Sequence, residues 1–527
     1  MGEYPFNQDD LRLMATLGIT ENQVRAQIAL FQRSSGYLRL LRPCTPGDGI
    51  QQIPTDETEP LIALQEEAAR QSRFIKFVPA SGAATRMFQG LLSFYLNRSS
   101  FDLDKIHPDL NGNDTEAGEL IRFLKRIEQF AFYEDLKESM TRDGLDITKT
   151  LQKKQWREIL DYLLTTRGLN YLNRPKGLHQ FHTYSSHKRT AFEEHLIEAV
   201  QTICDRTGQC HLHVTVSPEH EETFRNFFKT LQPTYENQYD CRFKVTFSFQ
   251  SHSRDTLAVD LENRPFREDS GALLFRPGGH GALLQNLNEL RGDLIYIKNI
   301  DNVLPDRLKK PTIVWKKILG GYLVKIQHII HDFIRKLTEE MVTPALLVEV
   351  GTFCRDRLCF FEPPDFQQGS IKEQTAFLFD FLNRPIRVCG MVKNEGEPGG
   401  GPFWVKDSEG VISLQIVEKA QLDPESSGQK AIWASSTHFN PVDLVCSVRN
   451  FEGRPFDLNR YVDPEAVFIA RKFQNGRDLK ALELPGLWNG AMAHWITLFV
   501  EVPIQTFSPV KTINDLLRPE HQNKSDG

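Results

Sequence analysis

The stretch FIKFVPASGAATRMF, residues 74–88, is the part of the sequence that decides the fold. An apolar run ends abruptly at Pro79-Ala80, a series of very small residues follows, and Thr85-Arg86 come directly after it. Phosphate-binding loops need these parts, because small residues let backbone N–H groups converge on oxygen atoms in front of a helix N-terminus or a cation. A tight turn between a buried strand and a helix has a similar composition, so this stretch alone leaves both interpretations open.

Length and composition predict a large globular protein without a broad nucleic-acid or membrane surface. The chain has 527 residues, of which 40% are hydrophobic and 25% are charged, as is ordinary for a protein with a sizeable core. The formal net charge of -6 argues against nucleic acid or an anionic membrane as partners, because both call for an excess of basic residues. The composition predicts no oligomeric state.

We expect a cytoplasmic protein with reduced thiols. No apolar run approaches the roughly 20 residues of a spanning helix, and the acidic Asp9 and Asp10 do not suit a secretory signal. The eight cysteines are scattered, without a CxxC pair or a histidine cluster at zinc spacing, which indicates buried thiols rather than disulfides or a metal site.

Two parts of the chain have helical periodicity, and the rest alternates between strand and helix patterns. Residues 9–73 and about 88–170 are predominantly helical in pattern. From Thr190 onward, β-branched strands such as HLHVTVS alternate with amphipathic helices, which is typical of βαβ units. We therefore predict an α/β fold with an open, doubly wound, mixed but mostly parallel sheet.

Three ranges make up the predicted domain organisation. They are an N-terminal helical segment, an α/β domain that carries a helical insertion at about 88–170, and a flexible tail, at residues 1–73, 74–517 and 518–527.

Two lysines follow turn-forming residues that could aim their charge at a phosphate. Lys176 lies between Pro175 and Gly177, and Lys511 follows a Pro-Val pair and precedes Thr512. Taken alone, each is also consistent with a solvated surface lysine.

Two further stretches suit a nucleotide and a metal ion. In RPGGHG, residues 276–281, three glycines surround His280, so that the backbone and the imidazole can approach a base or a phosphate closely. Asp301 lies in KNIDN at the end of an expected parallel strand, where open α/β sheets bind ligands and where a carboxylate can hold Mg²⁺. A glycine turn with only a geometrical role and an aspartate that caps a helix are the alternatives.

In this order, the stretches resemble the motifs of the UDP-sugar pyrophosphorylase family, the sugar-1-phosphate uridylyltransferases of the nucleotidyltransferase superfamily. The family's Gly-rich signature loop has a counterpart at residues 81–87. Its Pro-Lys-Gly, Pro-Gly-Gly-His-Gly and Asn-x-Asp-Asn motifs have counterparts at residues 175–177, 277–281 and 299–302. Its two sugar-contacting stretches and its closing lysine motif have counterparts at residues 415–418, 438–440 and 509–512. The whole chain also resembles a bacterial family described only as a domain of unknown function, DUF4301.

The resemblance implies a nucleotide-diphospho-sugar transferase-like fold and a reaction between a sugar 1-phosphate and a nucleoside triphosphate, UTP by resemblance, with Mg²⁺ as cofactor. It implies catalytic roles for Arg86, Lys176 and Lys511, and a metal-binding role for Asp301. The implied nucleotide-binding residues are Ser81, Gly82, Ala83, Ala84, Thr85, Gln250, Gly279, His280 and Gly281. Glu418 and Asn440 are the implied sugar-binding residues.

Two other functional classes stay open at this point. Ser81 and Ala84 replace two glycines of the signature loop, and Ala282 stands where many relatives have aspartate, so a non-catalytic sugar-nucleotide sensor is an alternative. A dinucleotide-dependent oxidoreductase would need a strand that ends in an acid about 20 residues after the loop. Asp102 and Asp104 lie there, but SFYLNRSSFDLD does not have a clear strand pattern.

Overall fold

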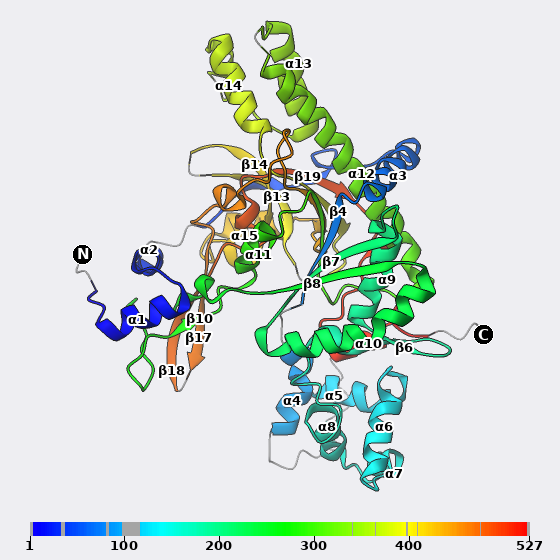
Figure 1. Cartoon of the computed structure of the whole chain (residues 1–527). Coiled ribbons are helices and arrows are strands. Elements are labelled where there is room, and N and C mark those ends of the chain that lie inside the picture. Colours follow the sequence, from blue (N-terminus) through cyan, green and yellow to red (C-terminus); the bar gives the residue numbers. More distant parts are fainter. Residues whose placement is uncertain are drawn as a thin grey trace. The chain divides into compact units, whose positions relative to one another are not determined.

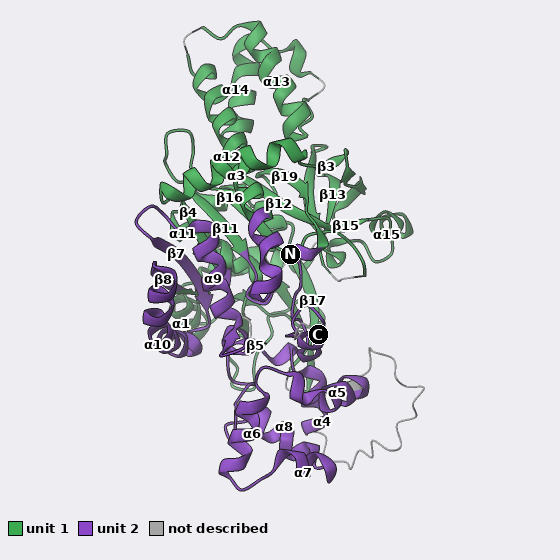
Figure 2. Cartoon of the chain, turned by 90° about the vertical axis from the view of Figure 1, so that its right-hand side faces the viewer, with its two compact units in different colours: residues 1–77, 248–297, 315–504 green, residues 78–247, 298–314, 505–527 purple. Residues whose placement is uncertain are grey.

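The computed structural model describes two compact units, each assembled from three separate parts of the chain (Figures 1 and 2). Unit 1 comprises residues 1–77, 248–297 and 315–504, and unit 2 comprises residues 78–247, 298–314 and 505–527. The described residues are 4–32, 37–80, 84–96, 116–339, 341–363, 365–396, 399–407, 409–474 and 476–523. The predicted ranges 1–73, 74–517 and 518–527 remain a prediction about domains, which this division into units does not test.

Unit 1 is built on a mostly parallel sheet. Its strands lie in the order β2-β3-β19-β12-β16-β11-β4, and β15 pairs with β12. Strand pairs β2/β3, β3/β19, β19/β12 and β11/β4 are parallel, whereas β16 runs antiparallel to β12. The strands are β2 (Thr45–Pro46), β3 (Gly49–Gln51), β4 (Phe74–Pro79), β11 (Leu294–Lys298), β12 (Ile386–Lys393), β15 (His438–Phe439), β16 (Asp443–Ser447) and β19 (Ile496–Glu501). The predicted fold class, α/β with a mostly parallel sheet, is confirmed.

The stretch that decided the fold contributes the strand β4 as predicted. Phe74, Phe77 and Val78 are buried, and β4 pairs in parallel with β11, in which all five residues are buried. Parallel strands covered on both faces read as continuous apolar runs, as both of these do. Phe77 belongs to the main hydrophobic cluster of unit 1, together with Ile297, Met391 and Phe499 from neighbouring strands.

The N-terminal segment is only partly helical, which corrects one expectation. Helices α1 (Gln8–Leu17), α2 (Glu21–Gln32) and α3 (Thr55–Arg70) form, but the apolar run at 37–41, inside the range 9–73 that was predicted to be helical, leads into the strand β1 (Arg39–Pro43). This strand pairs antiparallel with β13 (Gly401–Lys406), and β13 pairs with β14 (Ile412–Val417). The distant partner strand, which supplies hydrogen bonds to β1, explains the difference.

The remaining elements of unit 1 are small antiparallel pairs and helices. The pairs are β9 (Thr256–Leu257) with β10 (Phe275–Arg276), and β17 (Phe468–Gln474) with β18 (Arg477–Glu483). The helices are α11 (Leu283–Leu290), α12 (Asp306–Leu337), which begins in unit 2, α13 (Pro344–Leu358), α14 (Ile371–Leu382) and α15 (Ser427–Ala434). Helices α13 and α14 pack side by side (Figure 1).

Unit 2 contains strands, long helices and a helical insertion. Strands β7 (Gln209–Val216) and β8 (Arg242–Phe249) are neighbours, and β5 (Gln180–Thr183) pairs with β6 (Lys188–Thr190). Helices α9 (Ala191–Ile203) and α10 (Glu221–Tyr239) accompany them. Five helices gather in the predicted insertion (Figure 2), namely α4 (Gln89–Leu96), α5 (Glu116–Lys125), α6 (Tyr133–Arg142), α7 (Ile147–Gln152) and α8 (Trp156–Leu164).

The described part of the predicted tail, residues 518–523, contains a buried histidine. His521, inside the range 518–527, is only 3% exposed and is hydrogen bonded on both ring nitrogens. Within the described parts of the chain, no helix combines the length and the apolar character needed to cross a membrane. The eight cysteines are free, and six of them are buried, as the composition predicted.

A buried ion pair in unit 1 gives a stability prediction. Lys316 of α12 is 1% exposed, and its Nζ lies 2.5 Å from the Asp443 carboxylate at the start of β16. Lys316→Met should lower the free energy of unfolding by about 3–5 kcal/mol in urea denaturation, because it removes the ammonium group that pairs with a buried carboxylate. Adding Asp443→Leu should recover most of this loss.

Lys317→Met is the matched control for this prediction. Lys317 is the next residue, and it pairs with Glu66 in a more exposed setting, so its loss should cost less than about 1 kcal/mol. Equal effects of the two single variants would contradict the argument from burial.

Candidate functional site

In unit 2, two predicted lysines donate hydrogen bonds to the carboxylate of a third predicted residue, Asp301. Lys176 Nζ donates to Asp301 Oδ2 at 2.8 Å, and Lys511 Nζ donates to Oδ2 at 3.1 Å and to Oδ1 at 3.3 Å. The side chains of Lys176 and Asp301 are nearly buried, whereas that of Lys511 is 51% exposed. Two cations on one anion leave the cluster with an excess of positive charge, which suits the binding of phosphate oxygens.

The three residues reach this point from segments that are far apart in the sequence. Asp301 follows the end of β11, as expected from its place after a parallel strand. Lys176 begins a short 3-10 turn whose next residue, Gly177, is buried. A Cβ atom there would lie 2.9 Å from the Phe224 ring and 3.1 Å from Ile300. Glycine is therefore required at 177, because any side chain would push Lys176 away from Asp301.

Backbone contacts place the third residue, Lys511. The Val510 N–H donates to the Asp301 carbonyl oxygen at 3.0 Å, and Pro509 forms an isolated bridge with Asn302. The N–H groups of Lys511 and Thr512 both donate to the Asp515 carboxylate at 2.7 Å. The segment thus lies along the Asp301 loop with its ammonium group directed at the carboxylate.

Burial and charge shift the pKa values within the cluster. Burial is the main reason why the pKa of Lys176 lies below its ordinary value, while the Asp301 carboxylate opposes this shift and Lys511 adds to it. Burial alone would raise the pKa of Asp301, but Lys176 and Lys511 outweigh it, so this pKa lies below its ordinary value. Asp301 is therefore ionised at neutral pH.

The donor set around Asp301 fits Mg²⁺ held jointly with a substrate. Among the described residues, Asp301 Oδ1 accepts one long bond, from Lys511, and a carboxylate oxygen can accept more than one. Among the residues that the structure describes, no three His, Cys, Asp or Glu side chains form a metal-binding group. Mg²⁺ is commonly held by one or two carboxylates plus phosphate oxygens, and Asp301 can supply the protein ligand of such a site.

The small-residue loop after β4 is described only in its second half. Ser81, Gly82 and Ala83 lie outside the described residues, as do Asp102 and Asp104. Ala84, Thr85 and Arg86 form a 3-10 turn in which Ala84 is buried and the other two residues are exposed. Within the described residues, the Arg86 side chain makes no ion pair or hydrogen bond.

In unit 1, His280 is the centre of a second predicted cluster. The Leu487 N–H donates to His280 Nδ1 at 3.1 Å, and the ring stacks on Trp488 with centroids 4.4 Å apart. Because Nδ1 accepts, the neutral ring carries its proton on Nε2, which lies 3.8 Å from Glu418 Oε1. Burial lowers the pKa of His280 to about 4, so this tautomer is the form present at neutral pH.

Tight packing in the RPGGHG loop holds His280 in place. At Gly281, a Cβ atom would lie 2.1 Å from the Pro485 carbonyl oxygen, so no larger residue fits there. The loop thus packs directly on the segment that contains Trp488. Sequence reasoning missed Trp488 and also Glu483, whose carboxylate lies beside Gly279. Their signal was the turn-rich stretch LPGLWNG, residues 484–490.

Both predicted sugar-binding residues are in unit 1. Burial raises the pKa of the Glu418 carboxyl group, and Glu483 raises it further. Asn440 is 4% exposed. Its Oδ1 accepts from the Val442 N–H, and its Nδ2 is buried without a partner among the described residues. Gln250 likewise has a buried Nε2 without a partner there. Such unpaired donors are costly unless a ligand or water satisfies them.

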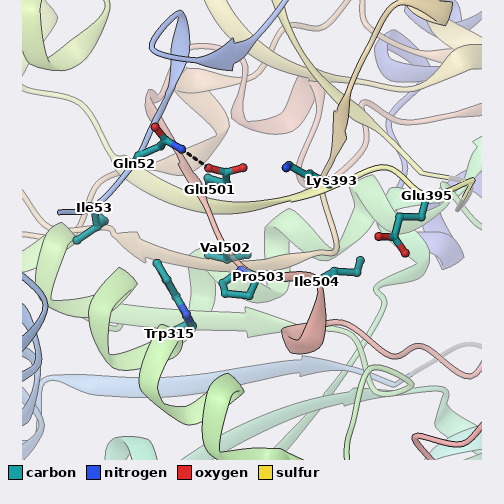
Figure 3. A pocket seen from close by; sticks show the side chains of 9 residues that line it. All are labelled: Gln52, Ile53, Trp315, Lys393, Glu395, Glu501, Val502, Pro503 and Ile504. Carbon is teal, nitrogen blue, oxygen red and sulfur yellow. Dashed lines mark hydrogen bonds between the residues drawn. The ribbon is translucent and has the colours of Figure 1, made fainter. Parts of the chain in front are cut away.

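A cavity of about 360 Å³ in unit 1 was not anticipated from the sequence (Figure 3). It lies where the parallel strands β12 and β19 end, because Lys393 and Glu501 are their last residues. Glu501 accepts hydrogen bonds from Gln52 at 2.6 Å and from His438 at 3.3 Å. Ile53, Trp315, Glu395 and residues 502–504 complete the lining. Its size, mixed lining and place at strand ends are typical of a small-molecule site.

The structure therefore brings some predicted residues together within each unit. Lys176, Asp301 and Lys511 share hydrogen bonds in unit 2, and His280 lies close to Glu418 in unit 1. No hydrogen bond or ion pair joins Gln250 or Asn440 to the other predicted residues among those described.

The family model described as "Domain of unknown function (DUF4301)" matches residues 7–522. The chain belongs to the DUF4301 family. No curated protein matches the chain.

Solved structures of two pyrophosphorylases are similar to this DUF4301 chain. A mutant of UDP-glucose pyrophosphorylase from Leishmania major, in complex with UDP-glucose, is 13% identical, with a TM-score of 0.44; the match covers 97% of this chain and 78% of that one. UDP-N-acetylglucosamine pyrophosphorylase from Trypanosoma brucei, in complex with an inhibitor, is 13% identical, with a TM-score of 0.45 and coverage of 97% and 79%. At these identities and TM-scores, the likeness carries no argument about activity.

The coupling around Asp301 predicts a change in the titration of Lys176. Because Asp301 raises the pKa of Lys176 against burial, Asp301→Asn should lower that pKa further. NMR titration of isotope-labelled dimethyl-lysine groups would measure it. Glu138→Gln, which removes an exposed carboxylate of unit 2, should leave the titration of Lys176 unchanged. A rise in the pKa in Asp301→Asn would contradict the pairing.

The buried setting of His280 predicts its tautomer and its pH dependence. Imidazole ¹⁵N NMR should show a neutral ring with its proton on Nε2 at pH 7 and a titration midpoint at about 4. Because the unfolded chain takes up this proton near pH 6.5, stability associated with His280 should be lost as the pH falls from about 6.5 toward 4. A midpoint close to 6.5 would rule out the buried, stacked arrangement.

Proposed function

We propose that the DUF4301 chain is a nucleotidyltransferase that joins a sugar 1-phosphate to a nucleoside triphosphate, with release of pyrophosphate. UTP is the proposed nucleotide, and Mg²⁺ is the proposed cofactor. The observation that carries the proposal is the meeting of Lys176 and Lys511 at Asp301. These residues come from three separate motifs of one family. A purely structural role of the motifs would not require all three to meet at one carboxylate.

The chemistry of the cluster suits phosphoryl transfer. In the proposed reaction, a phosphate oxygen of the sugar 1-phosphate attacks the α-phosphorus in line, and the bond from this phosphorus to the bridging oxygen of pyrophosphate breaks. Such a reaction needs the two anions held together and their charge offset, with little covalent participation by the protein. Lys176 would bind the α-phosphate and Lys511 the sugar phosphate, while Arg86 and the 81–85 loop would bind the β- and γ-phosphates.

The metal ion would be held by Asp301 together with phosphate oxygens of the substrate. When bound there, Mg²⁺ would supply positive charge that offsets the charge on the transferred phosphoryl group. The two lysines now paired with Asp301 would then exchange one acceptor for another, because phosphate oxygens replace the carboxylate as their partner. The cluster thus holds both lysines close to where the phosphates would lie.

Recognition of base and sugar is proposed for residues of unit 1. The Gly279–Gly281 loop and Gln250 would face the base, and the ring of His280, held neutral and supported by Trp488, would offer a flat surface without a charge. Glu418 and the unpaired Nδ2 of Asn440 would hydrogen bond with sugar hydroxyls. The raised pKa of Glu418 reflects its partial burial and the neighbouring Glu483, and partial burial strengthens a hydrogen bond to a hydroxyl.

Pyrophosphate release by the purified protein tests the proposal. Four nucleoside triphosphates would be crossed with a panel of hexose and N-acetylhexosamine 1-phosphates in the presence of Mg²⁺. We expect turnover with one pair of substrates. In Lys176→Ala, Asp301→Ala and Lys511→Ala, kcat/KM should fall about 10²- to 10³-fold, because each substitution removes a charged side chain that would bind a phosphate or the metal ion. Lys229→Ala, which removes an exposed lysine of unit 2, should be silent.

Two outcomes would count against the enzyme. Full activity of Lys176→Ala or Asp301→Ala would refute the assigned roles. Absence of pyrophosphate release across the panel, combined with a rise in melting temperature on addition of UTP or a UDP-sugar, would identify the alternative, a non-catalytic sugar-nucleotide-binding protein. The altered small-residue loop, with Ser81 and Ala84 in place of glycines, is the feature that favours this alternative.

A further inference from the structure

A chain of four buried polar side chains in unit 2 is not used by the proposed reaction. Ser508 Oγ lies 3.0 Å from His521 Nε2, and His521 Nδ1 lies 2.9 Å from His182 Nε2. His182 Nδ1 in turn lies 2.8 Å from Glu194 Oε1. All four residues are at most 4% exposed, so no substrate reaches Ser508, and a role as nucleophile is excluded by access.

The charge of Glu194 fixes the direction of the hydrogen bond that this carboxylate accepts. Lys309 and the hydrogen bond from His182 outweigh burial and hold the pKa of Glu194 below its ordinary value, so it is an acceptor only. His182 must therefore donate through Nδ1. With one proton on each ring, His521 Nδ1–H donates to His182 Nε2, and the Ser508 hydroxyl donates to His521 Nε2.

This arrangement tolerates at most one additional proton. One added proton reverses the hydrogen bonds between the two rings and between His521 and Ser508. His182 then carries the charge and donates to His521, and His521 donates to Ser508. A second proton would place two N–H groups against each other at 2.9 Å, which breaks the contact between the rings. The charged and titratable groups that face the pair are Glu194, Lys309, Arg189, Asp306, Tyr184 and Arg518.

The same chain ties the C-terminal segment to the rest of unit 2. Ser508 and His521 belong to residues 505–523, whereas His182 is in β5 and Glu194 is in α9. Between its two tied ends, the segment carries Lys511 and the Val510 N–H that donates to the Asp301 carbonyl oxygen. Arg307 reinforces the second end by donating to the carbonyl oxygens of Pro519, Glu520 and Gln522.

We propose that the Ser508–His521–His182–Glu194 chain is a clasp that closes the C-terminal segment on unit 2 and thereby positions Lys511 at Asp301. The four residues are positioning residues, because they act through Lys511 and do not touch the reacting atoms. The effect on catalysis rests on the proposed function, whereas the effect of the clasp on the segment does not. The Lys511 side chain is half exposed, so its position depends on how the segment that carries it is held.

Hydrogen exchange measured by mass spectrometry on the full chain tests the clasp without any substrate. In Ser508→Ala and His521→Phe, amides of residues 508–517 should exchange at least tenfold faster than in the wild type. His521→Gln should restore most of the protection, because its amide can donate to His182 and accept from Ser508. His187→Gln, an exposed histidine near β5, is the matched control and should leave exchange unchanged.

The pH dependence of this protection gives a second readout. Burial and the neighbouring His182 hold the pKa of His521 well below its ordinary value, whereas in an open segment His521 takes up a proton at an ordinary histidine pKa. Protection should therefore fall below about pH 6.5 by up to tenfold per pH unit. After correction for intrinsic exchange, His521→Gln should show a flatter dependence, since the histidine that titrates is missing.

Kinetics separates the clasp from the proposed function. If the transferase activity is present, His521→Phe should raise the KM for the sugar 1-phosphate at least tenfold more than the KM for the nucleotide. If no activity is found, the exchange experiment still decides the clasp. Unchanged exchange in both Ser508→Ala and His521→Phe would overturn it, and so would a rise spread equally over all of unit 2, because the chain would then stabilise the whole unit.

Discussion

The pairing of Asp301 with Lys176 and Lys511 constrains much of unit 2, because a buried carboxylate is costly without partners. Its position is set by the end of β11, so each partner has to come to it. Lys176 comes on a turn that only Gly177 allows, since Phe224 and Ile300 fill the space where a side chain would lie. Lys511 comes from the far end of the chain. It is held by the backbone bond from the Val510 N–H to the Asp301 carbonyl oxygen and by the Asp515 carboxylate, which accepts from the Lys511 N–H. The two lysines thus depend on packing in different ways.

This difference explains why the C-terminal segment needs its own fastening. Its bonds to the Asp301 loop are few, and the Lys511 side chain is half exposed. The buried Ser508–His521–His182–Glu194 chain adds directed hydrogen bonds at both ends of the segment, anchored on a carboxylate whose charge is fixed by Lys309. Directed bonds specify a single arrangement more strictly than apolar contacts do, since each donor must meet an acceptor.

The polar cluster of unit 1 favours neutral side chains, whereas the cluster of unit 2 favours charged ones. Around Asp301, opposite charges keep the buried groups ionised, whereas burial favours the neutral forms of His280 and Glu418. A neutral imidazole stacked on Trp488 and a carboxyl group with a raised pKa suit uncharged parts of a ligand, such as a base or hydroxyl groups. The cationic cluster suits phosphates.

The sequence by itself determined the sheet and many of the residues that line it. Buried parallel strands read as apolar runs, and residues at their ends, such as Asp301, can be found because their position follows from the strand itself. Only the tertiary structure decided which distant segments meet. The strand β1 looked helical until β13 supplied its hydrogen-bonding partner, and nothing in HQNKSDG indicated that His521 is buried between Ser508 and His182. Periodicity reports burial along one element, but pairing between elements depends on contacts that no local pattern contains.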